Sequence, residues 1–434
     1  MKNQVQMNEK KLIFGIPEYE FVLLLIVHIC ALFTFIGNST VHTIVGIVAI
    51  GCTCLLAFNQ YLYLLLPVYM IFYEQLVPFG GFVGYRIYTF VVIVSCIFTK
   101  NTKVSFKSIL FFLFLMLYTF GIVYVKDKNA TVMYVINFLF LALYSENYLK
   151  EGINYKQFFA FMALSAVLSA AYGLFGGNAN VGNVMLIDGE YIEYTRFLAT
   201  FNDPNYLGLI FNVIIFALLC IKYENKFLRI GAITVCYIAL LATLSVTAII
   251  VNLGFLAIYF VFVKKLNPVV LPIMLIIVVI IVNMYNYALS NDMGFITNFA
   301  YRIDAKIEAL NEGDIDATTT DRTELSRNNL EKFSEKSIFG MLFGGSYITS
   351  TGKEKTIFKE VSHNEFVDNL LFFGIIGAIL FWSYFIARFR KATMIVKNDT
   401  EIKKAVIFAK VIYIAYCFTL TIFPDIRLMF LFFI

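Results

Sequence analysis

Residues 362–387 read SHNEFVDNLLFFGIIGAILFWSYFIA, in which a polar tetrad, Ser362-His363-Asn364-Glu365, is followed at once by a long apolar run. A helix needs roughly 20 apolar residues to cross the hydrocarbon of a bilayer. Similar runs recur along all 434 residues, of which 60% are hydrophobic and only 15% are charged, and the mean hydropathy is +0.79. This composition excludes an ordinary soluble domain and predicts a polytopic membrane protein.

The predicted fold class is an all-α transmembrane bundle of about 12–14 spans. Because a helical bundle in lipid shares one interior, residues 1–434 are expected to form a single integral membrane domain. The polar start, residues 1–11, leads into a long apolar run without a small-residue cleavage site, which indicates a retained first span. The predicted spans lie near residues 17–36, 41–58, 60–77, 85–99, 107–125, 130–147, 157–175, 205–222, 228–245, 247–263, 268–288, 365–387 and 404–423.

Lysine and arginine gather in short loops between these spans. If the basic N-terminus is cytoplasmic, alternate loops are also cytoplasmic, and they are the basic ones, as the positive-inside rule requires. These loops carry Lys100, Lys103, Lys107, Lys222, Lys226, Arg229, Lys264, Lys265, Arg388, Arg390, Lys391, Lys397, Lys403 and Lys404. The formal net charge of +5 therefore reports orientation in the cytoplasmic membrane and does not indicate a nucleic-acid partner.

Two long segments, 176–204 and 289–364, are left on the extracytoplasmic face by this topology. The larger one contains twelve Asp and Glu against nine Lys and Arg, a small acidic excess opposite in sign to the inner loops. Helical spacing in 301–310 and 322–333 predicts two short helices at the outer surface. Part of an active site is expected in this larger loop.

The first candidate site lies in the smaller loop, where Arg196 precedes Asp203-Pro204-Asn205. Asp203 followed by proline predicts a helix start, whose N–H groups and positive dipole end favour a phosphate. Arg196 adds a permanent cation with a bidentate fork. The alternative is a capped helix beside an interfacial arginine that reaches toward water.

The second candidate is the pair Arg322 and Arg327, near the start of the predicted helix 322–333. Asp321 and Glu324 have the spacing of a capping box, which orients that start. The alternative for two arginines on a charged helix is a solvated face.

The third candidate is the tetrad itself. Ser362 and Glu365 have capping-box spacing ahead of an apolar run and are explained as the start of a helix. That explanation leaves out His363, which contributes nothing to such a cap. At an outer membrane surface, His363 could take a proton from a hydroxyl.

Other features are weaker. Arg86 begins another span that starts at the outer face, and it could supply a third cation. Asp314-Ile-Asp316 resembles the metal-binding motif of enzymes that use nucleotide sugars. This motif lies in an external loop, however, whereas nucleotide sugars are cytoplasmic. Lys410 lies deep in a span, and such a charge is a functional suspect, although one lysine is too little for an ion pathway. The seven cysteines lie in or beside apolar runs and indicate neither a disulfide nor a zinc site.

The boxes together resemble the superfamily of O-antigen polymerases (Wzy) and O-antigen ligases (WaaL), which are integral membrane glycosyltransferases. The resemblance covers about residues 190–390 and rests on three boxes that occur in order around a large external loop. The chain departs from the family at Ser245-Val246-Thr247, which lacks an arginine that many members carry at this position. The boxes are Arg196 with Phe201-Asn-Asp-Pro-Asn205; Asp321-Arg-Thr-Glu-Leu325 with Phe339-Gly340 and Phe343-Gly-Gly345; and Ser362-His-Asn-Glu-Phe366 with Phe373-Gly-Ile-Ile-Gly377.

The resemblance implies a GT-C-like fold and transfer of a glycan from a polyprenyl diphosphate carrier to an acceptor sugar at the outer face, with inversion. Its implied catalytic residues are His363 as base and Arg322 and Arg196 as stabilisers of the leaving diphosphate, with no metal and no cofactor. The expected substrate-binding residues are Asn205, Arg327 and Asn364 within the region of resemblance, and Arg86 outside it as a further cation. The expected partners are a polyprenyl-diphosphate-linked oligosaccharide and the lipid bilayer, together with flippase and chain-length regulator proteins.

Three functions remain open at this point. A polysaccharide polymerase that makes O-antigen, capsule or exopolysaccharide is favoured because it needs no lipid A core acceptor. An O-antigen ligase shares the same boxes. A lipid-linked oligosaccharide flippase or transporter would also suit a dozen spans, but its site is expected near the midplane between pseudo-repeats, and the sequence shows no such repeat.

Overall fold

The structure is a computed structural model that describes residues 12–36, 38–73, 75–76, 84–98, 154–175, 180–187, 190–264, 295–313, 322–344, 347–348, 354–355 and 362–422, with the single positions 136, 140, 143, 144, 147, 287, 428 and 431. The predicted span 107–125, most of the predicted spans 130–147 and 268–288, and Asp314-Ile-Asp316 lie outside these residues. The described part is mostly helical and carries helices long and apolar enough to cross a membrane, which confirms an all-α membrane protein.

The first half of the chain supplies α1 (Glu18–Phe33), α2 (Ser39–Leu55), α4 (Gly84–Phe98) and α7 (Tyr155–Leu174) at predicted spans. The span predicted at 60–77 is wrong. This region instead forms a 3-10 turn, η1 (Leu62–Leu65), and the short helix α3 (Leu66–Ile71), both fully buried. Its apolar residues pack inside the protein, so hydrophobicity alone misassigned them to lipid.

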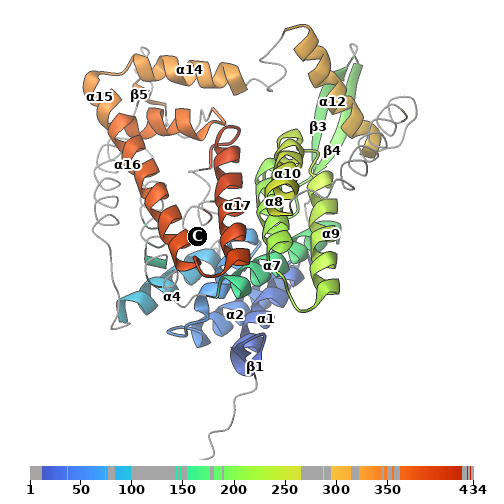
Figure 1. The fold of residues 1–434 in the computed structure, drawn as a ribbon, viewed down its shortest axis with the longest axis vertical. Helices are drawn as coiled ribbons and strands as arrows, with labels where there is room; N and C mark the ends of the chain where they lie inside the picture. The colour runs from blue at the N-terminus through green and yellow to red at the C-terminus, as the bar shows by residue number, and fades with distance from the viewer. Residues whose placement is uncertain are drawn as a thin grey trace, which may run out of the picture.

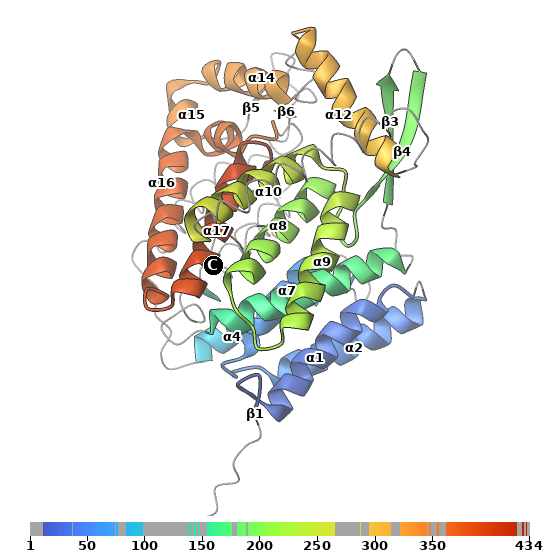
Figure 2. The ribbon, with the colours of Figure 1, turned by 45° about the vertical axis from the view of Figure 1, so that its right-hand side comes forward.

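The second half supplies α8 (Pro204–Cys220), α9 (Lys226–Ala242), α10 (Val246–Ile258) with the π-helical turn η2 (Tyr259–Val263), α16 (Glu365–Ile395) and α17 (Thr400–Cys417), again at predicted spans. In Figure 1, α8, α9, α16 and α17 stand side by side, and α1, α2 and α7 cross beneath them at a steep angle, as Figure 2 shows from a second side.

Short elements gather above the upper ends of these helices in Figure 1. They are the hairpin of β3 (Asn180–Ile187) and β4 (Glu190–Phe197), then α12 (Phe295–Asn311), α14 (Arg322–Ser334) and α15 (Ile338–Phe343). Two-residue strand pairs complete the description: β1 (Leu12–Ile13) with β2 (Ile16–Pro17), and β5 (Tyr347–Ile348) with β6 (Glu354–Lys355). The two predicted surface helices are confirmed as α12 and α14, but the β3–β4 hairpin in the smaller loop was not predicted.

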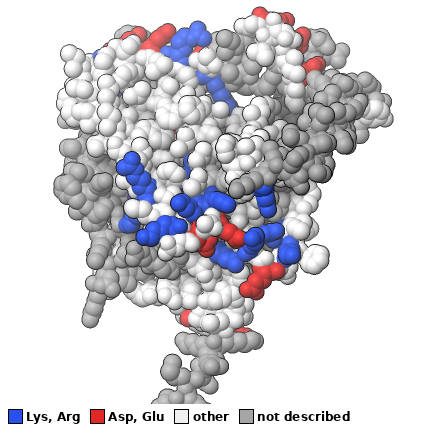
Figure 3. Space-filling view, in the orientation of Figure 1, with Lys and Arg blue, Asp and Glu red and all other residues white. Residues whose placement is uncertain are grey.

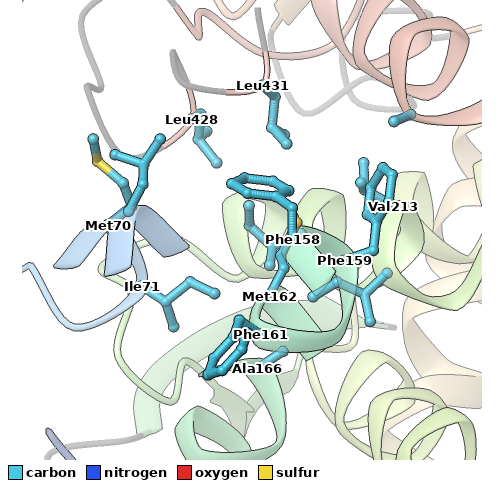
Figure 4. Packing of buried hydrophobic residues seen from close by; sticks show 14 of the residues in the cluster. Met70, Ile71, Phe158, Phe159, Phe161, Met162, Ala166, Val213, Leu428 and Leu431 are labelled. Carbon is cyan, nitrogen blue, oxygen red and sulfur yellow. The ribbon is translucent and has the colours of Figure 1, made fainter. Parts of the chain in front are cut away.

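Helix α7 lies at the centre of the apolar core. Phe158, Phe159 and Met162 of this helix pack among Ile71 of α3 and Val213 of α8 (Figure 4), and one contiguous cluster of buried residues runs from α1 to α17. Large aromatic side chains dominate this core, and each buries roughly 150–250 Å². Packing of the two halves of the chain therefore supports the helices that carry the polar residues discussed below.

Charged side chains are unevenly placed on the surface. On the face drawn in Figure 3, lysine and arginine gather in the lower half, and a largely uncharged band separates them from the charged side chains at the top. Exposed basic residues at this end include Lys222 in the turn between α8 and α9, Lys226 at the start of α9, and Lys397 in the turn between α16 and α17. These turns lie at the end opposite to α14, as the predicted alternation of loops requires.

Helix α16 is broken at Gly374, which has φ 67° and ψ −178°. The segment before the break runs across the upper end of the bundle, and the segment after it descends beside α17 (Figure 1). The predicted span 365–387 is therefore wrong at both ends. The descending helix begins only after Gly374 and continues to Ile395, so Arg388 lies within it and is buried rather than in a loop.

Candidate functional site

The start of α8 is capped as the sequence predicts. Asp203 accepts a hydrogen bond from the amide of Asn205 at 2.7 Å, and Pro204 occupies the first helical position. The side chain of Asn205 also donates to Asp203, at 2.8 Å, and accepts from the Ser245 hydroxyl at 2.6 Å. The backbone amides of Tyr206 and Leu207 donate to the Asp203 carbonyl. The first amides of this helix are thus engaged, and a carboxylate occupies its dipole end, so the phosphate expected there is not supported.

Arg196 is held beside this helix start. It lies in β4, and its Nε donates to the Thr243 carbonyl at 3.0 Å, in the turn between α9 and α10. The same turn carries Ser245, the partner of Asn205. The hairpin, α8 and the α9–α10 turn therefore meet at Arg196 and Asn205, which the sequence placed in one box.

The tetrad forms a tight turn ahead of α16. His363 has φ 57°, in the left-handed region that non-glycine residues seldom adopt. Asn364 is the helix cap, because its side-chain oxygen accepts from the amides of Phe366 and Val367 at 3.1 and 3.3 Å. The predicted capping box of Ser362 and Glu365 is therefore wrong, since Ser362 lies two residues before the cap, Asn364.

Glu365 and Asp368, both fully buried in the first turns of α16, bind other parts of the chain. Glu365 accepts from the backbone amide of Ile422 at 2.6 Å. Asp368 accepts from the Ser362 amide with both oxygens at 3.0 Å, from the Asn329 side chain at 3.0 Å, and from the Thr421 hydroxyl. These bonds fix the tetrad against α14 and against the segment that follows α17.

The surroundings of His363 favour its neutral form by lowering its pKa. Its side chain is half-buried, and burial is the main cause that lowers its pKa; the Arg322 guanidinium lowers the pKa further, whereas Asp203 and Asp368 raise it. Its Nδ1 is buried and has no hydrogen-bond partner among the described residues. A neutral imidazole next to a permanent cation can accept a proton from a hydroxyl while the cation stabilises nearby negative charge.

The remaining predicted site residues differ in their positions. Arg322 begins α14 and is half-buried, whereas Arg327 is exposed further along the same helix. Arg86 is exposed on α4, which lies well below α14 in both Figure 1 and Figure 2. The structure therefore gathers Arg196, Asn205, Arg322, His363 and Asn364 near the upper ends of α8 and α16, but it does not bring α4 to them.

Sequence reasoning missed the residues that join these elements. Asp368 could have been found from the sequence, because burying a carboxylate inside an apolar run costs free energy unless other groups bind it. Asn329, Thr421 and Tyr206 carried none, since each acts through a partner at least 39 residues away in the chain.

Metal binding has no support in the described part of the chain. Across these residues, no group of three or more His, Cys, Asp or Glu side chains is placed to hold a metal ion. The metal-independent scheme stays a prediction, with Arg196 and Arg322 as the cations that would meet a diphosphate.

Comparison with known proteins bears on the second half of the chain. Residues 230–382 match the family model described as O-antigen ligase, a range that contains Arg322 and His363 but not Arg196. No curated protein and no solved structure matches the chain. The match confirms the resemblance to the polymerase and ligase superfamily, and it supports a membrane protein that polymerises or ligates glycans supplied as a lipid-linked oligosaccharide.

Proposed function

We propose that this chain, in which residues 230–382 match the O-antigen ligase family, is a membrane polysaccharide polymerase. It transfers glycan repeat units from polyprenyl (undecaprenyl) diphosphate carriers to a growing lipid-linked chain at the outer face of the cytoplasmic membrane. The product is O-antigen, capsule or exopolysaccharide. The observation that carries this proposal is the half-buried His363, whose Nδ1 has no hydrogen-bond partner among the described residues and whose neutral form is favoured by burial and by the Arg322 guanidinium, both of which lower its pKa.

The transfer step needs a base and a stabiliser of the leaving group. His363 takes the proton of the acceptor hydroxyl as its oxygen forms a bond to the anomeric carbon of the donor sugar. The bond from that carbon to the diphosphate oxygen breaks, and the polyprenyl diphosphate leaves with the electron pair. Arg322 and Arg196 stabilise the charge that develops on it. Attack from the face opposite the leaving group inverts the anomeric centre.

Other proposed contacts follow from position. Asn205 and Asn364 lie in the helix starts that border His363 and Arg322, and we assign them to substrate binding, together with Arg327 on α14. Arg86 is the weakest member of this group because α4 lies apart. Flippase and chain-length regulator proteins are expected to act with the polymerase, which needs a supply of translocated repeat units and a control of product length.

The test is reconstitution of the purified protein in lipid nanodiscs with polyprenyl-diphosphate repeat units. A polymerase gives a ladder of lipid-linked products, and His363→Ala and Arg322→Ala abolish it, whereas Arg390→Lys at the opposite end of α16 leaves it unchanged. A ladder that persists in both site variants would overturn the proposal. Movement of lipid-linked glycan across liposomes without joining of units would instead show a flippase.

A ligase is the alternative within the same family. Deletion of the gene distinguishes the two activities in cells. Loss of a polymerase leaves single-repeat glycans, whereas loss of a ligase leaves full-length chains that are not attached to lipid A core.

A further inference from the structure

We propose that Asp368 is a positioning residue for this glycosyl transfer: its buried carboxylate fixes the His363 turn relative to the helix that carries Arg322. This inference rests on the proposed function. It concerns a residue that touches neither the donor nor the acceptor and acts through three neighbouring parts of the chain.

The first part is the His363 turn itself. The Ser362 amide donates to both oxygens of Asp368, at 3.0 Å each, and Ser362 is fully buried. The next residue, His363, is held at φ 57°. A non-glycine residue in this region is strained and persists only when its surroundings fix it. The two bonds to Asp368 supply such a constraint directly beside the imidazole.

The second part is α14. Asn329 of this helix is buried and donates to Asp368 at 3.0 Å. Arg322 precedes Asn329 by seven residues, which is about two helical turns, so the two residues lie on one face of α14. The bond therefore fixes the rotation of α14 about its axis and its position along that axis relative to the His363 turn, at the end of the helix where Arg322 lies.

The third part is the segment that follows α17. The Thr421 hydroxyl donates to Asp368, and the Thr421 carbonyl accepts from the Tyr206 hydroxyl at 2.9 Å. Tyr206 lies in the first turn of α8, three residues after Asp203. This chain of bonds connects the His363 turn to the α8 start, where Asn205 and Arg196 are held.

The described donors to Asp368 suit an ionised carboxylate, because that group only accepts hydrogen bonds and both its oxygens have described donors. An asparagine at this position has nearly the same shape but would point an NH₂ group at one of these donors. Asp368→Asn therefore disturbs the contacts made by one of the two oxygens without creating a cavity.

The experiment is a double-mutant cycle on the reconstituted enzyme. Asn329→Leu removes the donor on α14 without substituting His363 or Arg322, and Arg322→Gln removes the cation. If Asp368 positions Arg322 through Asn329, Asn329→Leu lowers kcat roughly tenfold in the wild type but at most about twofold when Arg322 is already Gln. KM for the acceptor should change less than kcat, because the acceptor's own contacts remain.

Equal effects of Asn329→Leu in both backgrounds would overturn the positioning role while leaving the proposed function intact. Wild-type rates in His363→Ala would instead overturn the proposed function. Stability is controlled by Asn212→Leu, a buried change away from the tetrad that is expected to lower the unfolding temperature but to keep kcat per folded molecule. If Asp368→Asn behaves as Asn212→Leu does, the residue is merely structural and the inference fails.

Discussion

Gly344, which ends α15, and Gly374, which breaks α16, lie backbone against backbone although they are far apart in the sequence. A Cβ atom on Gly374 would lie 2.7 Å from the carbonyl carbon and oxygen of Leu342, and one on Gly344 would lie 2.7 Å from the carbonyl carbon of Phe373. Both glycines have positive φ, 74° and 67°, with ψ near the extended range. Only glycine readily adopts this backbone region, so the two positions let α15 pack on the bend of α16.

Gly374→Ala is expected to destabilise the protein strongly. The backbone conformation alone costs about 1–3 kcal/mol for a residue with a Cβ, and the clash with Leu342 adds to this. Unfolding followed by fluorescence of Trp382 should show a lower midpoint, and polymer formation should fall with it. Gly231→Ala is the matched control, because its Cβ would meet nothing within 4 Å and alanine favours the helix. Equal stability of the two variants would contradict the close contact.

The pH dependence of transfer should report His363. Burial and the Arg322 guanidinium hold its pKa below the ordinary histidine value of about 6.5, so the neutral base predominates above that pH. We expect kcat/KM to rise with pH to a plateau, with a midpoint below 6.5. Arg322→Gln should move the midpoint of the residual activity upward, because a cation that disfavours protonation is gone.

Asp203→Asn should move the same midpoint downward. Asp203 raises the pKa of His363, and asparagine keeps the helix cap while removing the charge. A shift in the same direction as that of Arg322→Gln would show that the titrating group is not His363.

Arg196→Lys tests whether geometry or charge matters at the hairpin. Lysine keeps the cation but lacks the Nε that donates to the Thr243 carbonyl, and it cannot bind a diphosphate with two parallel donors. We expect kcat/KM for the donor to fall about 10- to 100-fold. The measurement is steady-state kinetics with varied donor. Arg390→Lys, an exposed exchange of the same kind, should change nothing.

A buried polar network between α8, α10 and α17 should contribute to stability. The Asn212 side chain donates to the Ala248 carbonyl and to the Tyr416 hydroxyl, each at 2.9 Å, and accepts from Asn252 at 2.8 Å. Asn212→Leu leaves these partners unsatisfied and is expected to cost about 1–3 kcal/mol. Replacing Asn212 and Asn252 together by leucine should cost less than the sum of the two single changes, as thermal unfolding can show. Strict additivity would mean that the two side chains do not interact.

Metal removal is expected to leave transfer unchanged, because Arg196 and Arg322 supply the positive charge in the proposed step. Washed membranes treated with a chelator should form the same product ladder as untreated ones. Loss of the ladder that added Mg²⁺ or Mn²⁺ restores would replace the arginine scheme with a metal-assisted one.

The sequence predicted those features of the site that depend on a few neighbouring residues. Asp203 followed by Pro204 predicted the start of α8, and helical spacing predicted α12 and α14. The predicted N-cap of α16 was wrong because a neighbouring residue forms the cap: Asn364 caps the helix in place of Ser362. The sequence also predicted a span at 60–77, because apolar residues that pack in a protein interior read the same as residues that face lipid.

What the sequence determined by itself is a helical membrane protein with polar boxes at helix starts, because hydropathy and capping act over one segment at a time. What only the tertiary structure decided is how the boxes meet. The bend at Gly374 turns the His363 helix start across the bundle, and Asp368 then binds Asn329 and Thr421 from distant segments. Burial of a carboxylate in an apolar run demands partners, but the chain order does not say which ones; packing of α14, α16 and α17 does.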